Sequence, residues 1–111
     1  MENTKQIEIW KDIPGFNGKY FISNLGRVKS IYKYKNKNEI KEIFKTINLD
    51  KHGSPRVSLS LNDRTYTFFI QKLAANAFIP NPTNATVIIH KNNIKTDNRI
   101  ENLEWIYKYL E

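Results

Sequence analysis

The chain has 111 residues, a net charge of +7, no cysteine and two histidines, which suits one small domain or two very small modules. The lack of cysteine excludes disulfides, thiolate zinc sites and cysteine nucleophiles, and two histidines are too few for most histidine-based metal cages. Because the sequence has neither an apolar run of 18 residues nor a signal-like start, we expect no membrane insertion and a cytoplasmic location.

The positive charge lies mainly in the first half of the chain. Residues 1–60 contain 12 Lys and Arg against 6 Asp and Glu, whereas residues 61–111 contain 6 against 5. Such a basic surface favours polyanions, with nucleic acid as the leading candidate and plain solubility as the alternative. The residues expected to contact phosphate lie close together in the sequence: Arg27, Lys29, Lys33, Lys35 and Lys37.

Turn residues and alternating patterns predict several short strands in the first half of the chain. Residues 20–22 form a first strand, residues 23–26 a turn whose Gly26 can take positive φ, and residues 27–32 a returning strand. Residues 33–42 are polar and charged, which is consistent either with a mobile connection or with a tip lying along phosphate. Residues 43–44 and 46–49 are candidates for a further strand.

The middle of the chain gives the clearest predictions of secondary structure. Residues 56–61 alternate between apolar and polar, Asn62-Asp63 is a turn dipeptide, and residues 64–69 return, so we predict a hairpin. Leu73, Ala74, Ala77 and Phe78 then follow helical spacing, which predicts a short helix over about 70–78 that Pro80 and Pro82 end.

His90 follows the apolar strand 87–89 and begins a stretch that is rich in asparagine. An imidazole is the side chain whose unperturbed pKa lies near neutral pH, so a positioned histidine can act as a general base. Asn102, twelve positions later, is a candidate to orient the ring, while Leu103 and Trp105 are expected to pack the segment against the helix. The alternative is that His90 merely ends a strand and the asparagines fill a turn.

Two segments together resemble a known pairing of modules. The first is Trp10-x-x-Ile13-Pro-Gly15 with Tyr20-x-x-Ser23-Asn24-x-Gly26-Arg27-Val28-x-Ser30, which resembles the nuclease-associated module of many phage and intron-encoded homing endonucleases. The second runs from Gln71 to Trp105 and is similar to their HNH, or ββα-metal, nuclease domain. The resemblance implies an α+β fold. It has a small β module over 9–50, of DNA-binding type, and an HNH-like unit over 55–111, in which a hairpin and short helix precede the ββα element.

The resemblance also implies roles for individual residues. His90 matches the general base, and Asn102 matches the central asparagine of the HNH name. The family uses a single divalent ion, magnesium or manganese, which prefers oxygen ligands. The usual ligand positions hold Ile89, which has no side-chain oxygen, and Glu111, at the end of a predicted closing helix over 106–111. Asp97, in the loop, is a candidate replacement ligand. The alternative is that it only helps to form the turn.

These expectations lead to three hypotheses about function. The favoured one is a phage or mobile-element protein that binds double-stranded DNA, in the bacterial or infected host cell, and whose metal-dependent cleavage is weak or lost through a degenerate active site. The second is an active magnesium- or manganese-dependent nicking endonuclease that uses Glu111. The third is a repurposed phage-type protein that binds and inhibits a host protein.

Overall fold

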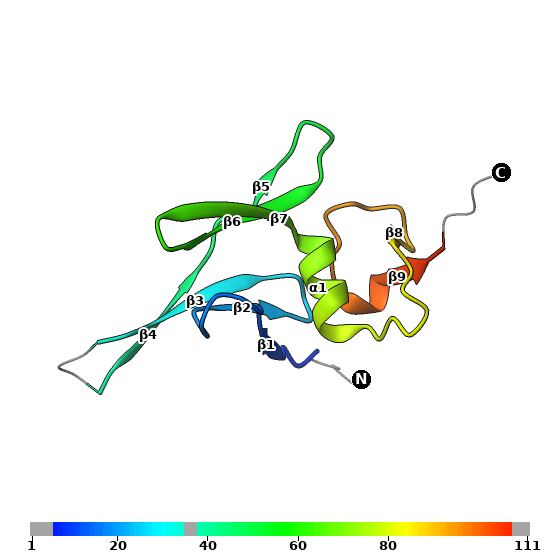
Figure 1. The fold of residues 1–111 in the computed structure, drawn as a ribbon. Coiled ribbons are helices and arrows are strands. Elements are labelled where there is room, and N and C mark those ends of the chain that lie inside the picture. Colours follow the sequence, from blue (N-terminus) through cyan, green and yellow to red (C-terminus); the bar gives the residue numbers. More distant parts are fainter. Residues whose placement is uncertain (1–5, 35–37, 108–111) are drawn as a thin grey trace, which may run out of the picture.

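The computed structural model describes residues 6–34 and 38–107 and confirms an α+β fold (Figure 1). Within these residues three antiparallel sheets surround one α-helix. In Figure 1 the helix α1 stands between the four-stranded sheet and the two-stranded C-terminal hairpin. None of the helices in the described part of the chain is long and apolar enough to cross a membrane.

The first sheet has the strand order β1-β2-β3-β4, and we call it, with its loops, the N-terminal module. Its strands are β1 (Trp10–Asp12), β2 (Tyr20–Ser23), β3 (Val28–Lys33) and β4 (Ile40–Phe44). The predicted hairpin over 20–32 is confirmed. The segment 33–42 is not simply a connection, because β4 begins within it and pairs with β3 from Lys29↔Phe44 to Lys33↔Ile40. The two strands form a long hairpin that projects from the molecule (Figure 1).

The second sheet contains β5 (Asn48–Leu49), β6 (Pro55–Leu61) and β7 (Arg64–Phe69). Asn62 and Asp63 both have positive φ, 50° and 63°, which is the backbone conformation of a two-residue type I′ hairpin turn. The chain then continues directly into α1 (Ile70–Phe78), whose bounds match the predicted helix.

The C-terminal hairpin consists of β8 (Val87–His90) and β9 (Leu103–Ile106), with the 3-10 helix η1 (Ile100–Asn102) leading into β9. Its register places His90 opposite Leu103. The predicted closing helix over 106–111 is wrong at its start, because Ile106 is the last residue of a strand. The expectation for Glu111 lies outside the described residues.

One hydrophobic core joins the N-terminal module to the rest of the protein. Ile22 and Val28 of the first sheet pack in the same cluster as Leu59 of β6 and Ile70 of α1. The buried Tyr20 reaches across to the second sheet, where its hydroxyl accepts a hydrogen bond from the Ser60 backbone N–H at 3.1 Å. The same cluster includes Leu103, the cross-strand partner of His90, so the core extends to the C-terminal hairpin.

Candidate functional site

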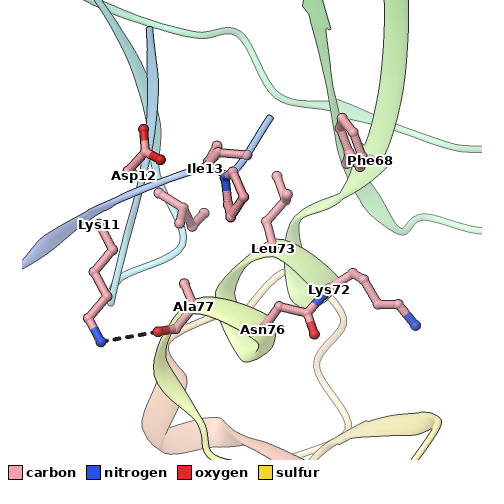
Figure 2. A pocket seen from close by; sticks show the side chains of 10 residues that line it. Lys11, Asp12, Ile13, Phe68, Lys72, Leu73, Asn76 and Ala77 are labelled. Carbon is pink, nitrogen blue, oxygen red and sulfur yellow. Dashed lines mark hydrogen bonds between the residues drawn. The ribbon is translucent and has the colours of Figure 1, made fainter. Parts of the chain in front are cut away.

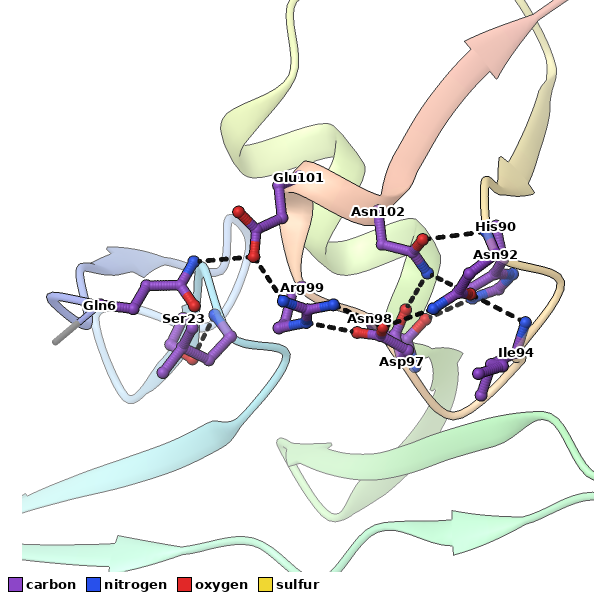
Figure 3. A network of polar contacts seen from close by, with 11 residues as sticks. Gln6, Ser23, His90, Asn92, Ile94, Asp97, Asn98, Arg99, Glu101 and Asn102 are labelled. Atoms are coloured by element: carbon purple, nitrogen blue, oxygen red, sulfur yellow. Dashed lines mark hydrogen bonds and ion pairs between the residues drawn. The ribbon is translucent and has the colours of Figure 1, made fainter. Parts of the chain in front are cut away.

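His90 stands at the end of β8, and a buried asparagine holds its ring (Figure 3). The Nε2 atom of His90 lies 2.7 Å from Oδ1 of Asn98, a side chain that is only 5% exposed. A carboxamide oxygen can only accept a hydrogen bond, so Nε2 carries the proton and Nδ1 keeps its lone pair. The arrangement therefore leaves one specified ring nitrogen able to take up a proton. We call His90, Asn98 and the loop up to Asn102 the His90 site.

Asn102 does not orient the His90 ring, contrary to the sequence prediction. Its Oδ1 accepts from the backbone N–H of Asn92 at 3.1 Å, and its Nδ2 donates to the Asp97 carbonyl oxygen at 2.9 Å. Asn102 thus ties the two ends of the loop together, and the contact with the ring belongs to Asn98. Sequence reasoning missed Asn98 because both asparagines follow the histidine within one loop, and spacing alone does not show which one folds back.

Asp97 lies in the same loop, and its carboxylate is fully engaged. Arg99 donates to both of its oxygens, from Nε at 2.7 Å and from Nη2 at 2.8 Å, and Asn92 donates to Oδ2 at 2.8 Å. The hydrogen bonds from Arg99 hold the pKa of the Asp97 carboxyl well below its usual range. Asp97 therefore acts as the anchor of Arg99 in this structure, and both oxygens already have donors.

The Asp97 ion pair predicts a specific acid dependence of stability. A depressed folded-state pKa contributes stability in full above about pH 4, where the unfolded carboxyl is also ionised, and loses it as pH falls toward the lowered pKa. Asp97→Asn should therefore lower the urea midpoint at pH 7, and the gap from wild type should close as the pH is lowered below about 4. A gap that stays constant with pH would contradict the ion pair as its cause.

One face of the N-terminal module carries basic residues whose charge is neutralised locally. The guanidinium of Arg27 pairs with Glu8 and lies 4.4 Å from the centroid of the Phe44 ring. Lys29 is buried, and its ammonium lies 3.1 Å from Glu42. Both cations thus have a carboxylate partner in the folded sheet, and their phosphate contacts stay a prediction. Their carboxylates lie 19 and 13 positions away in the sequence, beyond what local charge clustering can show.

The opposite face of the same sheet combines lysines with tyrosine rings. Tyr32 and Lys41 are direct cross-strand partners. Lys45 comes directly after β4, four positions beyond Lys41, and the alternation of the strand puts it on the same side. The ammonium of Lys19 lies 5.1 Å from the Tyr20 ring centroid and 5.8 Å from that of Tyr32. No ion pair among the described residues involves these three lysines. We call these five residues the lysine–tyrosine face.

The pKa of the Tyr20 hydroxyl reflects its surroundings at this face. Burial alone raises the pKa of the Tyr20 hydroxyl, but the Ser60 N–H bond and the nearby Lys19 and Lys45 outweigh it. The pKa therefore lies below its usual value, as expected next to unneutralised cations. Lys33 is exposed at the end of β3, while Lys35 and Lys37 lie outside the described residues.

Comparisons with known proteins agree with this arrangement. The family model of the NUMOD4 motif matches residues 8–60, and that of an HNH endonuclease matches residues 74–108. This chain belongs to the HNH homing endonuclease family. The NUMOD4 match covers the N-terminal module and continues through β5 into β6, and the HNH match begins within α1 and includes the His90 site.

Three relatives illustrate the similarity of this HNH family member. An uncharacterized HNH endonuclease, L247 of Acanthamoeba polyphaga mimivirus, is 39% identical over 93% of the chain and 25% of its own length. DNA endonuclease I-HmuI of Bacillus phage SP01 is 33% identical over 87% of the chain and 51% of its own length. A solved structure of the HNH homing endonuclease I-HmuI, described as DNA binding and cleavage, superposes with a TM-score of 0.75 at 31% identity. The match covers 89% of this chain and 52% of the I-HmuI chain. The chain thus spans about half or less of these proteins.

Side-chain oxygen ligands close to His90 are few in the described part of this HNH chain. Ile89, immediately before His90, pairs across the hairpin with Glu104 and offers no oxygen. Asp97 already receives donors on both oxygens. No group of three His, Cys, Asp or Glu side chains suited to a metal occurs within residues 6–34 and 38–107. These residues do not fit the family's ion on their own, and Glu111 lies outside the described range.

A separate apolar pocket lies between the N-terminal module and α1 (Figure 2). It has a volume of about 690 Å³ and is lined by side chains that include Ile13, Phe68 and Leu73. The Lys11 ammonium closes one side by donating to the Ala77 carbonyl oxygen at 3.1 Å. None of the residues that line it belongs to the His90 site, so we assign the pocket no part in the chemistry of His90.

Proposed function

We propose that this HNH-family chain binds double-stranded DNA and that its phosphodiester cleavage is weak or lost. The observation that carries the proposal is the lysine–tyrosine face, where Lys19, Lys41 and Lys45 lie together without carboxylate partners among the described residues. Lysine side chains of this kind contact phosphate oxygens, and the exposed ring of Tyr32 beside them offers a stacking surface. The similarity to I-HmuI, whose structure is described as DNA binding and cleavage, supports the same partner.

The shape of the N-terminal module supports contact with a long polyanion. The hairpin β3–β4 projects from the molecule, with Lys33 and Lys41 exposed along it (Figure 1). The interior of the module, by contrast, contains Lys29, which already has a carboxylate partner. We therefore assign phosphate binding to the lysine–tyrosine face and the hairpin, and give Arg27 and Lys29 the role of stabilising the sheet.

The His90 site supports the second half of the proposal. The ring is held with Nδ1 free, so the group that would accept a proton from water is in place. The oxygen ligands are the deficient part, because Ile89 has none and Asp97 is bonded to Arg99. Loss even of a residue that supports a metal ligand typically costs about 10- to 100-fold in activity. Magnesium or manganese would stabilise charge on phosphate if bound, and it is the binding that we expect to be impaired.

An active nicking endonuclease is the second candidate. The observation that favours it is the intact geometry of the loop, in which Asn102 joins Asn92 to Asp97 and Asn98 holds His90. Relaxation of supercoiled plasmid with magnesium or manganese separates the two candidates.

The experiment that tests DNA binding is the salt dependence of affinity. We expect the logarithm of the association constant for a short duplex to fall linearly with the logarithm of salt concentration, with a slope of about −0.9 per phosphate contacted. Fluorescence anisotropy between about 50 and 200 mM salt measures it. An affinity that does not change with salt, or the absence of binding, would reject the proposal and favour a host protein as the partner.

A further inference from the structure

The turn between β2 and β3, residues 23–26, contacts the His90 site directly. The backbone N–H of Ile100 donates to the Asn24 carbonyl oxygen at 3.0 Å. A Cβ atom added to Gly26 would lie 3.0 Å from the Asn98 Cβ and 3.1 Å from the Asn98 carbonyl oxygen. Contacts this short are tighter than nine in ten of those that real Cβ atoms make, so a side chain at Gly26 would require Asn98 to shift by a few tenths of an ångström.

The N-terminal module fixes the position of this turn. Ser23 is completely buried, and its hydroxyl oxygen accepts from the backbone N–H groups of Leu25 and Arg27 at 3.2 and 3.1 Å. The Asn24 side chain accepts from the Ile9 backbone N–H at 2.7 Å. Its amide donates to the Ile7 carbonyl oxygen at 2.9 Å. The turn is therefore held from inside by Ser23 and from the preceding segment through the Asn24 side chain.

Asn98 connects this turn to the imidazole. Its backbone and Cβ lie against Gly26, and its Oδ1 lies 2.7 Å from Nε2 of His90. We propose that the turn over residues 23–26 positions His90 through Asn98, so that the NUMOD4 module determines which ring nitrogen of the HNH histidine is free. Asn98 and Gly26 are positioning residues in this account. The inference rests on the proposed function only for the chemical role of His90.

A pair of glycine variants isolates the contact. Gly26 and Gly18 both have positive φ, 84° and 75°, so alanine is strained to a similar extent at either position. A Cβ at Gly18 meets no atom within 4 Å, whereas at Gly26 it meets Asn98. Gly26→Ala should therefore displace Asn98, and Gly18→Ala provides the control with the same backbone strain and no such contact.

The measurement is the exchange of the His90 Nε2–H proton with water, followed by ¹⁵N-resolved NMR of the full chain without DNA or metal. We expect a protected Nε2–H signal in wild type and in Gly18→Ala, and exchange about tenfold faster in both Asn98→Ala and Gly26→Ala, as for one lost hydrogen bond. His52 is an exposed turn residue and supplies the signal of an unprotected ring in the same spectrum. Because the readout needs neither DNA nor cleavage, it succeeds or fails separately from the proposed function.

A second variant covers the case in which Gly26→Ala does not fold. Asn24→Ala adds no bulk and removes side-chain bonds only to Ile7 and Ile9, on the far side of the turn from His90. Faster exchange of the His90 proton in this variant would support transmission through the turn. Unchanged exchange in both Gly26→Ala and Asn24→Ala, or an equal change in Gly18→Ala, would overturn the proposal.

Discussion

The double variant Lys41→Ala/Lys45→Ala should lose about 60-fold in affinity for duplex DNA at 0.1 M salt. The estimate assumes one phosphate contact for each lysine, since each contact contributes about 0.9 to the slope of log affinity against log salt. Two lost contacts make the slope about 1.8 units shallower. Over the one logarithmic unit between 1 M and 0.1 M salt, this difference in slope corresponds to about 60-fold in affinity. Anisotropy titrations at several salt concentrations give both quantities from the same data.

The control has the same change in net charge but lies elsewhere. Lys51 and Lys72 are exposed, outside the N-terminal sheet, and in no ion pair among the described residues. Lys51→Ala/Lys72→Ala should leave the slope within about 0.5 of wild type if the lysine–tyrosine face is the contact surface. Equal losses in both double variants would instead indicate diffuse attraction by net charge, without a defined face.

Ile89→Asp should raise strand nicking by about 10- to 100-fold over the parent in the presence of manganese. Position 89 immediately precedes His90 on β8 and is 37% exposed, but the isoleucine there has no side-chain oxygen that could bind a metal ion. Restoring a carboxylate there supplies a missing hard ligand, and effects of this size are typical when support for a metal is lost or regained. Conversion of supercoiled plasmid to the open circle measures the nicking rate.

Two further variants determine whether any gain arises at the His90 site. Thr83→Asp places the same charge on an exposed loop position outside the His90 site and should leave the nicking rate at the parental level. Ile89→Asp/His90→Ala should abolish the gain, because the base would be absent. If wild type nicks plasmid efficiently and His90→Ala does not, the active nickase replaces our proposal of weak or lost cleavage.

Elements whose sequence pattern reflects burial on one face could be predicted well. The α1 helix was predicted within its observed bounds because Leu73 and Ala74 form a buried stripe that ends before Pro80. Of the strand β4, only the last two residues, Ile43 and Phe44, were expected in a strand, because all five of its residues are exposed and no apolar alternation marks it. It is held by pairing with β3, and backbone hydrogen bonds leave no trace in the side-chain pattern.

The His90 site was predicted as a stretch of sequence but not as a set of contacts. Asn98 and Asn102 follow His90 by eight and twelve positions. The loop conformation, in which Asn93 has a φ of 61°, decides which of them reaches the ring. The basic residues show the same limit. A sequence lists Arg27 and Lys29 among the cations, but only the folded sheet places Glu8 and Glu42 beside them.

The contact between Gly26 and Asn98 has a consequence for how such genes can recombine. Crossovers between HNH genes that exchange the NUMOD4 segment alone would bring together a turn and a loop from different ancestors. A parent with a side chain in place of Gly26 would then place a Cβ 3.0 Å from the Asn98 Cβ of the other parent, so that loop would have to shift. Exchanges that yield a folded protein should therefore be those in which the residues at positions 26 and 98 fit together. In chimeric sequences we expect these two residues to come from the same parent or from parents that match at both positions.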